Sequence, residues 1–149
     1  MNLSELRAAL LPAIGNPSGV TNTILDDVIN RAYLRICDTF TFPQTTKRTT
    51  TNTSIGVRSY NLGANDLIVL GVWNKTHRYA LSKVDHHVVN DYDDQSTSNP
   101  RTGRPKKYYR DGSSIFIMPA PDAVYVLELV TKQKVAKLAN TSDTPVLYE

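Results

Sequence analysis

The chain has 149 residues, of which 40% are hydrophobic and 21% are charged, and its formal net charge is +3. This composition is typical of a globular domain and excludes an intrinsically disordered chain. No apolar run approaches the roughly 18 residues that cross a bilayer, and the N-terminus lacks the pattern of a signal peptide. We therefore expect neither a membrane span nor secretion. The lone cysteine, Cys37, lies in an apolar helical pattern, which predicts a buried side chain.

Two helices are predicted at the N-terminus. The first begins at an Asn2 or Ser4 cap and ends at Pro12. The second begins near Thr23, which with Asp26 resembles a capping box, and ends before Pro43. One stripe of the second helix is expected to be buried, namely Ile24, Leu25, Val28, Ile29, Ala32, Tyr33 and Ile36. Its opposite face is expected to be polar, namely Asp26, Asp27, Asn30, Arg31 and Arg35.

Strand patterns begin at Lys47. The threonines of residues 49–53 suit an exposed or edge strand, which we expect to form a hairpin with residues 57–62. Residues 67–73 are predicted to form a buried strand. A short strand is expected over 78–81.

A short helix is predicted over residues 82–92, with Ser82 as its N-cap, and a surface loop follows over 93–102. Asp111-Gly112 then predicts a two-residue hairpin turn in which both residues have positive φ. A further strand is expected over 124–131.

These elements indicate an α+β fold, with N-terminal helices, a mostly antiparallel β-sheet or small β-sandwich, and one short inserted helix. We expect one domain over residues 1–149. Its parts are a helical part at 1–43, a β-rich part at 44–135 with the short helix near 83–92, and a C-terminal segment at 136–149.

No pattern supports catalysis or a bound cofactor. The one cluster that suggests a metal joins His86 and His87 to Asp91, Asp93 and Asp94, with His87 and Asp91 on one helix face. A third ligand at a distance is not identifiable, so a solvated acidic loop is the better interpretation. A nucleophile elbow and a phosphate-binding loop are also missing from the sequence. We therefore predict no catalytic residue, no cofactor and no metal.

A basic segment supports an alternative function, a nucleic-acid-binding module. It contains two adjacent tyrosines among cations, in the order Arg101, Arg104, Lys106, Lys107, Tyr108, Tyr109 and Arg110. Because neighbouring residues of a strand point to opposite faces, at most one tyrosine could stack on a base. A strand edge protected by lysine is the simpler interpretation.

A third hypothesis is a β domain that binds a small ligand or carbohydrate. Trp73, Tyr79 and Tyr92 would then form its aromatic surface. Aromatic residues in sheets more often belong to the core.

The most specific signal is a series of short segments in a fixed order. They are Ile29-Asn30-Arg31-Ala32-Tyr33, Arg58-Ser59-Tyr60-Asn61-Leu62 with Asp66-Leu67, Gly103-Arg104-Pro105 through Tyr108, Ile115 through Asp122, and Asp143-Thr144-Pro145-Val146-Leu147. From the first segment to the last, the series spans most of residues 20–147. The series resembles the head-to-tail adaptor proteins of tailed bacteriophages, in particular the tail-tubular-protein-A type of short-tailed phages.

This resemblance implies a structural, non-enzymatic virion protein at the portal vertex. Such an adaptor is one subunit of a dodecameric ring between the portal protein and a tail nozzle or tail tube protein. DNA passes through the lumen with non-specific contact, and no membrane is involved. Adaptors of this type usually continue beyond the Asp-Thr-Pro-x-Leu segment, so a chain that stops at Glu149 is either a short variant or lacks its C-terminal end.

Two sets of residues follow as expected contacts within that assembly. The subunit interface is expected to use the charged face of the second helix, namely Asp26, Asp27, Arg31 and Arg35. The portal is expected to contact the C-terminal residues Val146, Leu147 and Tyr148.

Overall fold

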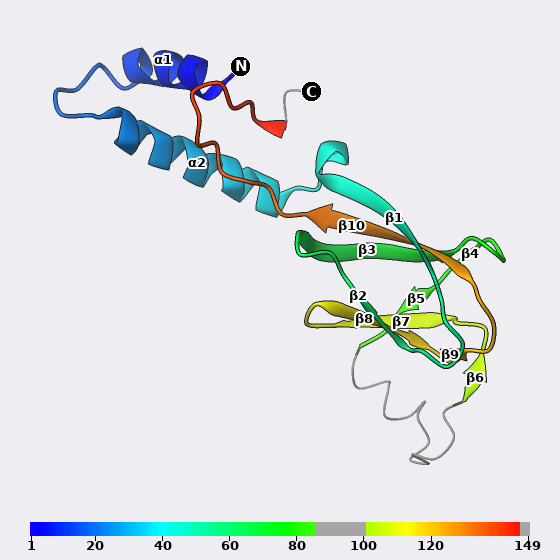
Figure 1. Ribbon diagram of the computed structural model, residues 1–149. Coiled ribbons are helices and arrows are strands. Elements are labelled where there is room, and N and C mark those ends of the chain that lie inside the picture. Colours follow the sequence, from blue (N-terminus) through cyan, green and yellow to red (C-terminus); the bar gives the residue numbers. More distant parts are fainter. Residues whose placement is uncertain (86–100, 147–149) are drawn as a thin grey trace. The chain divides into compact units, whose positions relative to one another are not determined.

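The computed structural model describes residues 1–85 and 101–146 (Figure 1). The chain forms two compact units. The helical unit consists of Met1–Thr46 and Lys134–Glu149, and the β unit consists of Lys47–Gln133. Across the described ranges, the helices are too short or too polar to cross a membrane.

The helical unit contains α1 (Leu3–Ala13), α2 (Asn22–Thr39) and a 3₁₀ turn (Pro43–Thr45). The predicted Asn2 cap of α1 is confirmed, because its side chain accepts the Glu5 N–H at 2.9 Å while the Glu5 carboxylate accepts the Asn2 N–H at 2.9 Å. The second helix starts earlier than predicted. Its N-cap is Thr21, whose hydroxyl accepts the Ile24 N–H at 3.4 Å.

In its described residues, the β unit contains two four-stranded sheets and one two-stranded sheet. The first four-stranded sheet has the order β1-β10-β3-β4, the second has the order β2-β8-β7-β5, and β6 pairs with β9. With the N-terminal helices, these sheets confirm the predicted α+β class. The strands are β1 (Thr46–Asn52), β2 (Ser59–Asn61), β3 (Asp66–Asn74), β4 (Tyr79–Ala80), β5 (Ser82–Lys83), β6 (Thr102–Gly103), β7 (Lys107–Asp111), β8 (Ser114–Met118), β9 (Ala120–Pro121) and β10 (Val126–Gln133).

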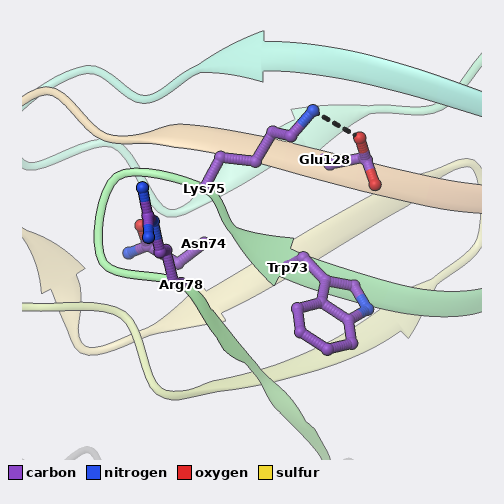
Figure 2. Close-up of a pocket in the computed structure, with 5 residues that line it drawn as sticks. All are labelled: Trp73, Asn74, Lys75, Arg78 and Glu128. Atoms are coloured by element: carbon purple, nitrogen blue, oxygen red, sulfur yellow. Dashed lines mark ion pairs between the residues drawn. The ribbon is translucent and has the colours of Figure 1, made fainter.

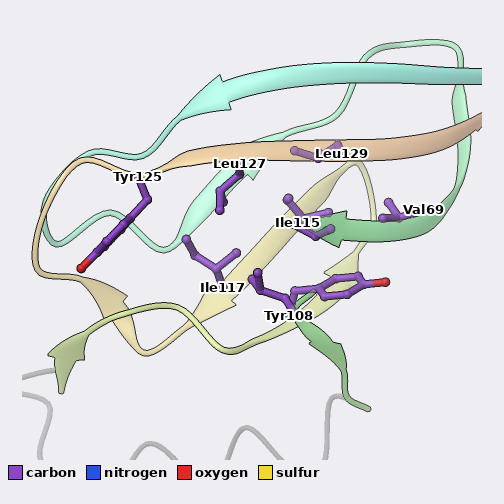
Figure 3. Packing of buried hydrophobic residues seen from close by; sticks show 9 residues of the cluster. Val69, Tyr108, Ile115, Ile117, Tyr125, Leu127 and Leu129 are labelled. Atoms are coloured by element: carbon purple, nitrogen blue, oxygen red, sulfur yellow. The ribbon is translucent and has the colours of Figure 1, made fainter. Parts of the chain in front are cut away.

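The core of the β unit takes side chains from both four-stranded sheets (Figure 3). Val69 of β3 and Leu127 of β10 come from the first sheet, and Tyr108 of β7 with Ile115 and Ile117 of β8 come from the second. All five are buried. Burial of each such side chain contributes about 1.5–3 kcal/mol, which makes this core the main stabilising feature of the unit.

The predicted hairpin between residues 49–53 and 57–62 is wrong. β1 is an edge strand beside β10, whereas β2 pairs with β8 in the other sheet. The reason lies at Thr53, whose N–H donates to the Tyr125 carbonyl at 2.8 Å and whose hydroxyl accepts the Tyr125 N–H at 2.8 Å. These bonds join the end of β1 to the segment before β10, so the chain changes sheets before β2.

The prediction of a buried strand at 67–73 is only half right. Val69 and Val72 of β3 are buried, whereas Leu67, Leu70 and Trp73 are exposed. The sheet contributes only one face to the core, and a register shift opposite Val69 and Gly71 puts Val69 and Val72 on that face although they are three residues apart, so the other apolar side chains of β3 point to solvent. β3 therefore adds apolar side chains to the surface of the unit.

Two further predictions need correction. The hairpin of β7 and β8 is confirmed, but Asp111 pairs with Ser114, so Gly112 and Ser113 form the turn and only Gly112 has a positive φ, of 55°. Ser82 and Lys83 form β5 in parallel register with β7 instead of starting a helix. The rest of that predicted helix, from residue 86, and the loop up to residue 100 lie outside the described residues.

One aspartate in each unit, Asp66 in the β unit and Asp143 in the helical unit, makes the stability of that unit sensitive to acid. Burial alone would raise the pKa of Asp66, but hydrogen bonds from Gln133, from Thr131 at 2.8 Å and from the Gly63 N–H at 2.7 Å lower it below its usual range. In the helical unit, Asp143 accepts the N–H groups of Asn140 and Ala139, both at 2.7 Å, and these bonds lower its pKa.

We expect stability to fall with pH in the acid range. A carboxylate with a lowered folded pKa stabilises the fold above its unfolded pKa, about 3.9, and this contribution is lost as the pH falls through the folded pKa. Thermal midpoints measured between pH 7 and pH 2.5 should therefore decrease steadily below pH 4. The decrease should be smaller in the Asp66→Asn and Asp143→Asn variants; an unchanged pH profile in both would contradict the assignment.

Candidate interaction surfaces

A buried asparagine ties the C-terminal segment to α2. The Nδ2 of Asn30 donates to the Leu138 carbonyl at 3.0 Å, and the Leu138 N–H donates to its Oδ1 at 2.8 Å. Asn30 is only 8% exposed, so its predicted place on the polar face is wrong. The side-chain amide of Asn30 thus satisfies both the N–H and the carbonyl of Leu138, as the backbone of a neighbouring strand would, and both of its own polar atoms are satisfied in return.

The same segment also bonds to α1. The N–H groups of Leu3 and Ser4 donate to the carbonyls of Asp143 at 2.9 Å and Thr141 at 3.1 Å, which satisfies donors that a helix start leaves open. Between the helices and this segment lies a small core of Leu3, Tyr33, Cys37 and Leu138. The predicted burial of Cys37 is confirmed. The segment thus fixes both helices from one side.

The charged residues predicted for the subunit interface fall into two groups. Asp26 forms a bidentate ion pair with Arg7 of α1, with both N···O distances at 2.5 Å. This pair holds α1 against α2 within one chain. Asp27, Arg31 and Arg35 are exposed, and within residues 1–85 and 101–146 their charged side chains have no hydrogen-bond or ion-pair partner.

Only half of the apolar stripe of α2 is covered. Residues four apart form ridges on a helix. The ridge that includes Leu25, Tyr33 and Cys37 is buried. The next ridge was predicted to be buried and is instead exposed, by 49% at Ile24, 52% at Val28 and 43% at Ile36. Ala32, between Val28 and Ile36, and Phe40, just after the helix, are exposed as well. The exposed apolar ridge therefore contains Ile24, Val28, Ala32, Ile36 and Phe40.

The exposed apolar ridge runs beside the charged one. Asp27, Arg31 and Arg35 follow each other at the same spacing of four residues, so α2 offers an apolar strip with a charged border. Protein interfaces commonly have this composition, with an apolar centre and a polar rim. We define Ile24, Val28, Ala32, Ile36 and Phe40 with Asp27, Arg31 and Arg35 as the α2 surface.

The residues predicted to face the portal are only partly described. Val146 packs against the small helical core, and its N–H donates to the Tyr33 hydroxyl at 3.3 Å. Leu147 and Tyr148 lie outside the described residues. Val146 therefore also anchors the end of the C-terminal segment in its own unit.

The basic segment does not offer aromatic side chains to a nucleic acid. Tyr108 and Tyr109 are both buried, and Tyr109 stacks on Phe116 with a centroid distance of 5.0 Å. The guanidinium of Arg110 donates to the backbone carbonyls of Leu67 and Gly112. The stacking function expected of this segment therefore has no exposed ring to carry it.

Of the aromatic surface of the third hypothesis, Trp73 and Tyr79 are described, and they lie on opposite faces of their sheet. The Tyr79 hydroxyl donates to the Pro105 carbonyl at 2.6 Å, and its ring packs against the core. Tyr92 lies outside the described residues, so of the three predicted residues only Trp73 is seen to be exposed. The histidines and aspartates of the predicted metal cluster, at 86–94, are also outside; in the described part of the chain no group of three acidic, histidine or cysteine side chains is placed to hold a metal.

A small α+β chain with an uncovered apolar ridge and a charged border has the features of a protein that assembles with other proteins. The family model described as SU10 adaptor protein matches residues 1–149, and the chain belongs to this family. The resemblance to phage head-to-tail adaptors is thereby confirmed, and the protein is a structural adaptor component of a phage virion. No curated protein matches the chain.

Proposed function

We propose that the protein is one subunit of a closed, dodecameric ring at the portal vertex, between the portal protein and the tail nozzle or tail tube protein. The ring surrounds a channel for DNA and carries out no catalysis. The match of the whole chain to the adaptor family supports this role, and the α2 surface is the observation that connects it to particular residues. A formal net charge of +3 is compatible with non-specific contact to DNA in the lumen.

Ring closure requires two different surfaces on each subunit, one for each neighbour. The α2 surface is the first. The second is α1, which is apolar over most of its length although Leu3 is the only residue of this helix that is fully buried. The second half of α1 exposes Ala8, Ala9 and Ala13, and the following Ile14 is exposed as well. We propose that the α2 surface of one subunit packs on α1 of the next, with Asp27, Arg31 and Arg35 at the border of the contact.

The contact to the portal is proposed at the C-terminal residues Val146, Leu147 and Tyr148. The N–H groups of Leu3 and Ser4 bond to Asp143 and Thr141 and so hold the segment before these residues against α1. Asp26 is proposed to support the subunit contact indirectly, because its ion pair with Arg7 positions α1 relative to α2.

This role predicts direct binding to the portal ring of the same phage. Mixed at about 10 μM, the purified chain and portal rings should form a complex whose native mass exceeds that of the portal ring by a fixed number of adaptor copies. The Leu147→Asp/Tyr148→Asp variant should bind at least tenfold more weakly, whereas Lys106→Asp in the β unit should bind normally. Portal rings that take up no adaptor copies would contradict the role.

A further inference from the structure

A hollow of about 270 Å³ lies on the β unit, lined by Trp73, Asn74, Lys75, Arg78 and Glu128 (Figure 2). Trp73 is the only tryptophan of the chain and is 48% exposed. It lies on β3 directly opposite Glu128 of β10, so both side chains share the outer face of their sheet. A half-exposed tryptophan beside charges is typical of the residues that dominate protein interfaces.

The turn after β3 fixes the position of Arg78. Asn74 is completely buried; its Oδ1 accepts the His77 N–H at 3.1 Å and its Nδ2 donates to the Tyr79 hydroxyl at 3.3 Å. Arg78 itself has a positive φ of 57°, which is unusual for a residue other than glycine. The backbone on both sides of the arginine is therefore held in place, and its side chain lines the hollow (Figure 2).

The hollow carries an excess of positive charge. Glu128 pairs with Lys75 at 2.7 Å and with Arg48 at 3.3 Å, and the hydrogen bond from Lys75 lowers the pKa of Glu128, which is thus ionised at neutral pH. Within the described ranges the Arg78 guanidinium has no hydrogen-bond or ion-pair partner. Two cations, Lys75 and Arg78, and one carboxylate, Glu128, therefore line the hollow, and the planar donor fork of Arg78 is available for an added carboxylate.

We propose that this hollow is a docking site for an acidic segment of another virion protein. A carboxylate of that segment binds Arg78, and an apolar side chain next to it covers the Trp73 ring. The cations gather around one hollow that also contains Glu128, whereas a nucleic-acid backbone is bound along an extended basic track. The charge pattern therefore favours an acidic protein segment over DNA. This inference rests on the proposed function, because it requires the chain to be part of the particle.

A peptide titration tests the chemistry of the site. Because Trp73 is the only tryptophan, its fluorescence reports on this hollow alone. The peptide acetyl-Glu-Leu-Glu-Leu-Glu-amide should shift the emission to shorter wavelength at low salt, and acetyl-Lys-Leu-Lys-Leu-Lys-amide should not. In Arg78→Gly, which loses the guanidinium while glycine tolerates the positive φ, affinity should fall about tenfold. Arg101→Gly removes an exposed arginine elsewhere and should leave the affinity unchanged. Equal responses to both peptides, or no effect of Arg78→Gly, would overturn the proposal.

Photo-crosslinking in particles tests the partner. The chain is supplied with p-benzoylphenylalanine in place of Trp73 during infection, the particles are purified and irradiated, and the crosslinked peptides are identified by mass spectrometry. A crosslink to an acidic segment of another virion protein supports the proposal. Particles that contain the chain but give a crosslink to DNA, to a second copy of the chain or to nothing overturn it and leave the adaptor role intact. Particles without the chain would reject the adaptor role itself.

Discussion

Replacement of Asn30 by leucine should destabilise the helical unit by about 2–4 kcal/mol. The substitution removes both hydrogen bonds to Leu138 and leaves a buried N–H and a buried carbonyl unpaired, each at a cost of about 1–3 kcal/mol. The added apolar side chain offsets part of this loss. Hydrogen exchange of the full chain, followed by mass spectrometry, should show faster exchange in α2 and in the segment 134–146, with little change in β3, β8 and β10.

A neighbouring residue provides the matched control. Arg31→Leu makes the same replacement one position later, at an exposed site, and should change stability by less than about 0.5 kcal/mol. Asn30→Asp keeps the size of the side chain but replaces the donor to the Leu138 carbonyl by an acceptor, so it should be as destabilising as Asn30→Leu. If the Asn30 and Arg31 variants exchanged alike, the pairing with Leu138 would not hold the C-terminal segment.

A double replacement on the α2 surface, Val28→Asp with Ile36→Asp, should reduce assembly on the portal ring by at least a hundredfold. Both side chains are exposed in the isolated chain, so new carboxylates there stay in water and the fold is retained. In the proposed subunit contact the same carboxylates would be buried without partners, which costs several kcal/mol. The measurement is the native mass of the complex, together with the thermal midpoint of the free chain.

The control places the same charges on the same helix but off the exposed apolar ridge. Asn22→Asp and Thr23→Asp lie in the first turn of α2, where the helix dipole favours acidic side chains. This variant should assemble normally and melt at the wild-type temperature or slightly above it. Normal assembly of the Val28/Ile36 variant would exclude this ridge from the contact.

Local chemistry explains what the sequence could predict of the fold. The Asn2 cap depends on Glu5, three residues away, and the β7–β8 hairpin depends on a glycine between two short strand patterns. The partner of Asn30 lies 108 residues away, and periodicity cannot show it. The same holds for Thr53, whose bond to Tyr125 sends β1 and β2 into different sheets. Non-local pairings of this kind require the folded chain.

The surfaces were harder to predict than the fold, for a related reason. The apolar stripe of α2 shows which side chains are hydrophobic, but whether each is covered depends on the size of the surrounding unit. The small core around Tyr33 covers one ridge and leaves Ile24, Val28 and Ile36 exposed. Asp26 looked available for a neighbour, yet Arg7, 19 residues earlier, pairs with it. Trp73 was among the residues predicted to form a binding surface. Arg78 was given no binding role, because its place in the same hollow as Trp73 depends on the turn after β3.

The central claim is that this chain acts by assembling with copies of itself and with other virion proteins. Asymmetric cryo-electron microscopy of purified particles tests it most directly. We expect a ring of copies at the portal vertex, with the helical unit in the ring and the exposed apolar ridge of each α2 in contact with the next copy. Intact, infectious particles whose neck lacks density for this chain would contradict the claim.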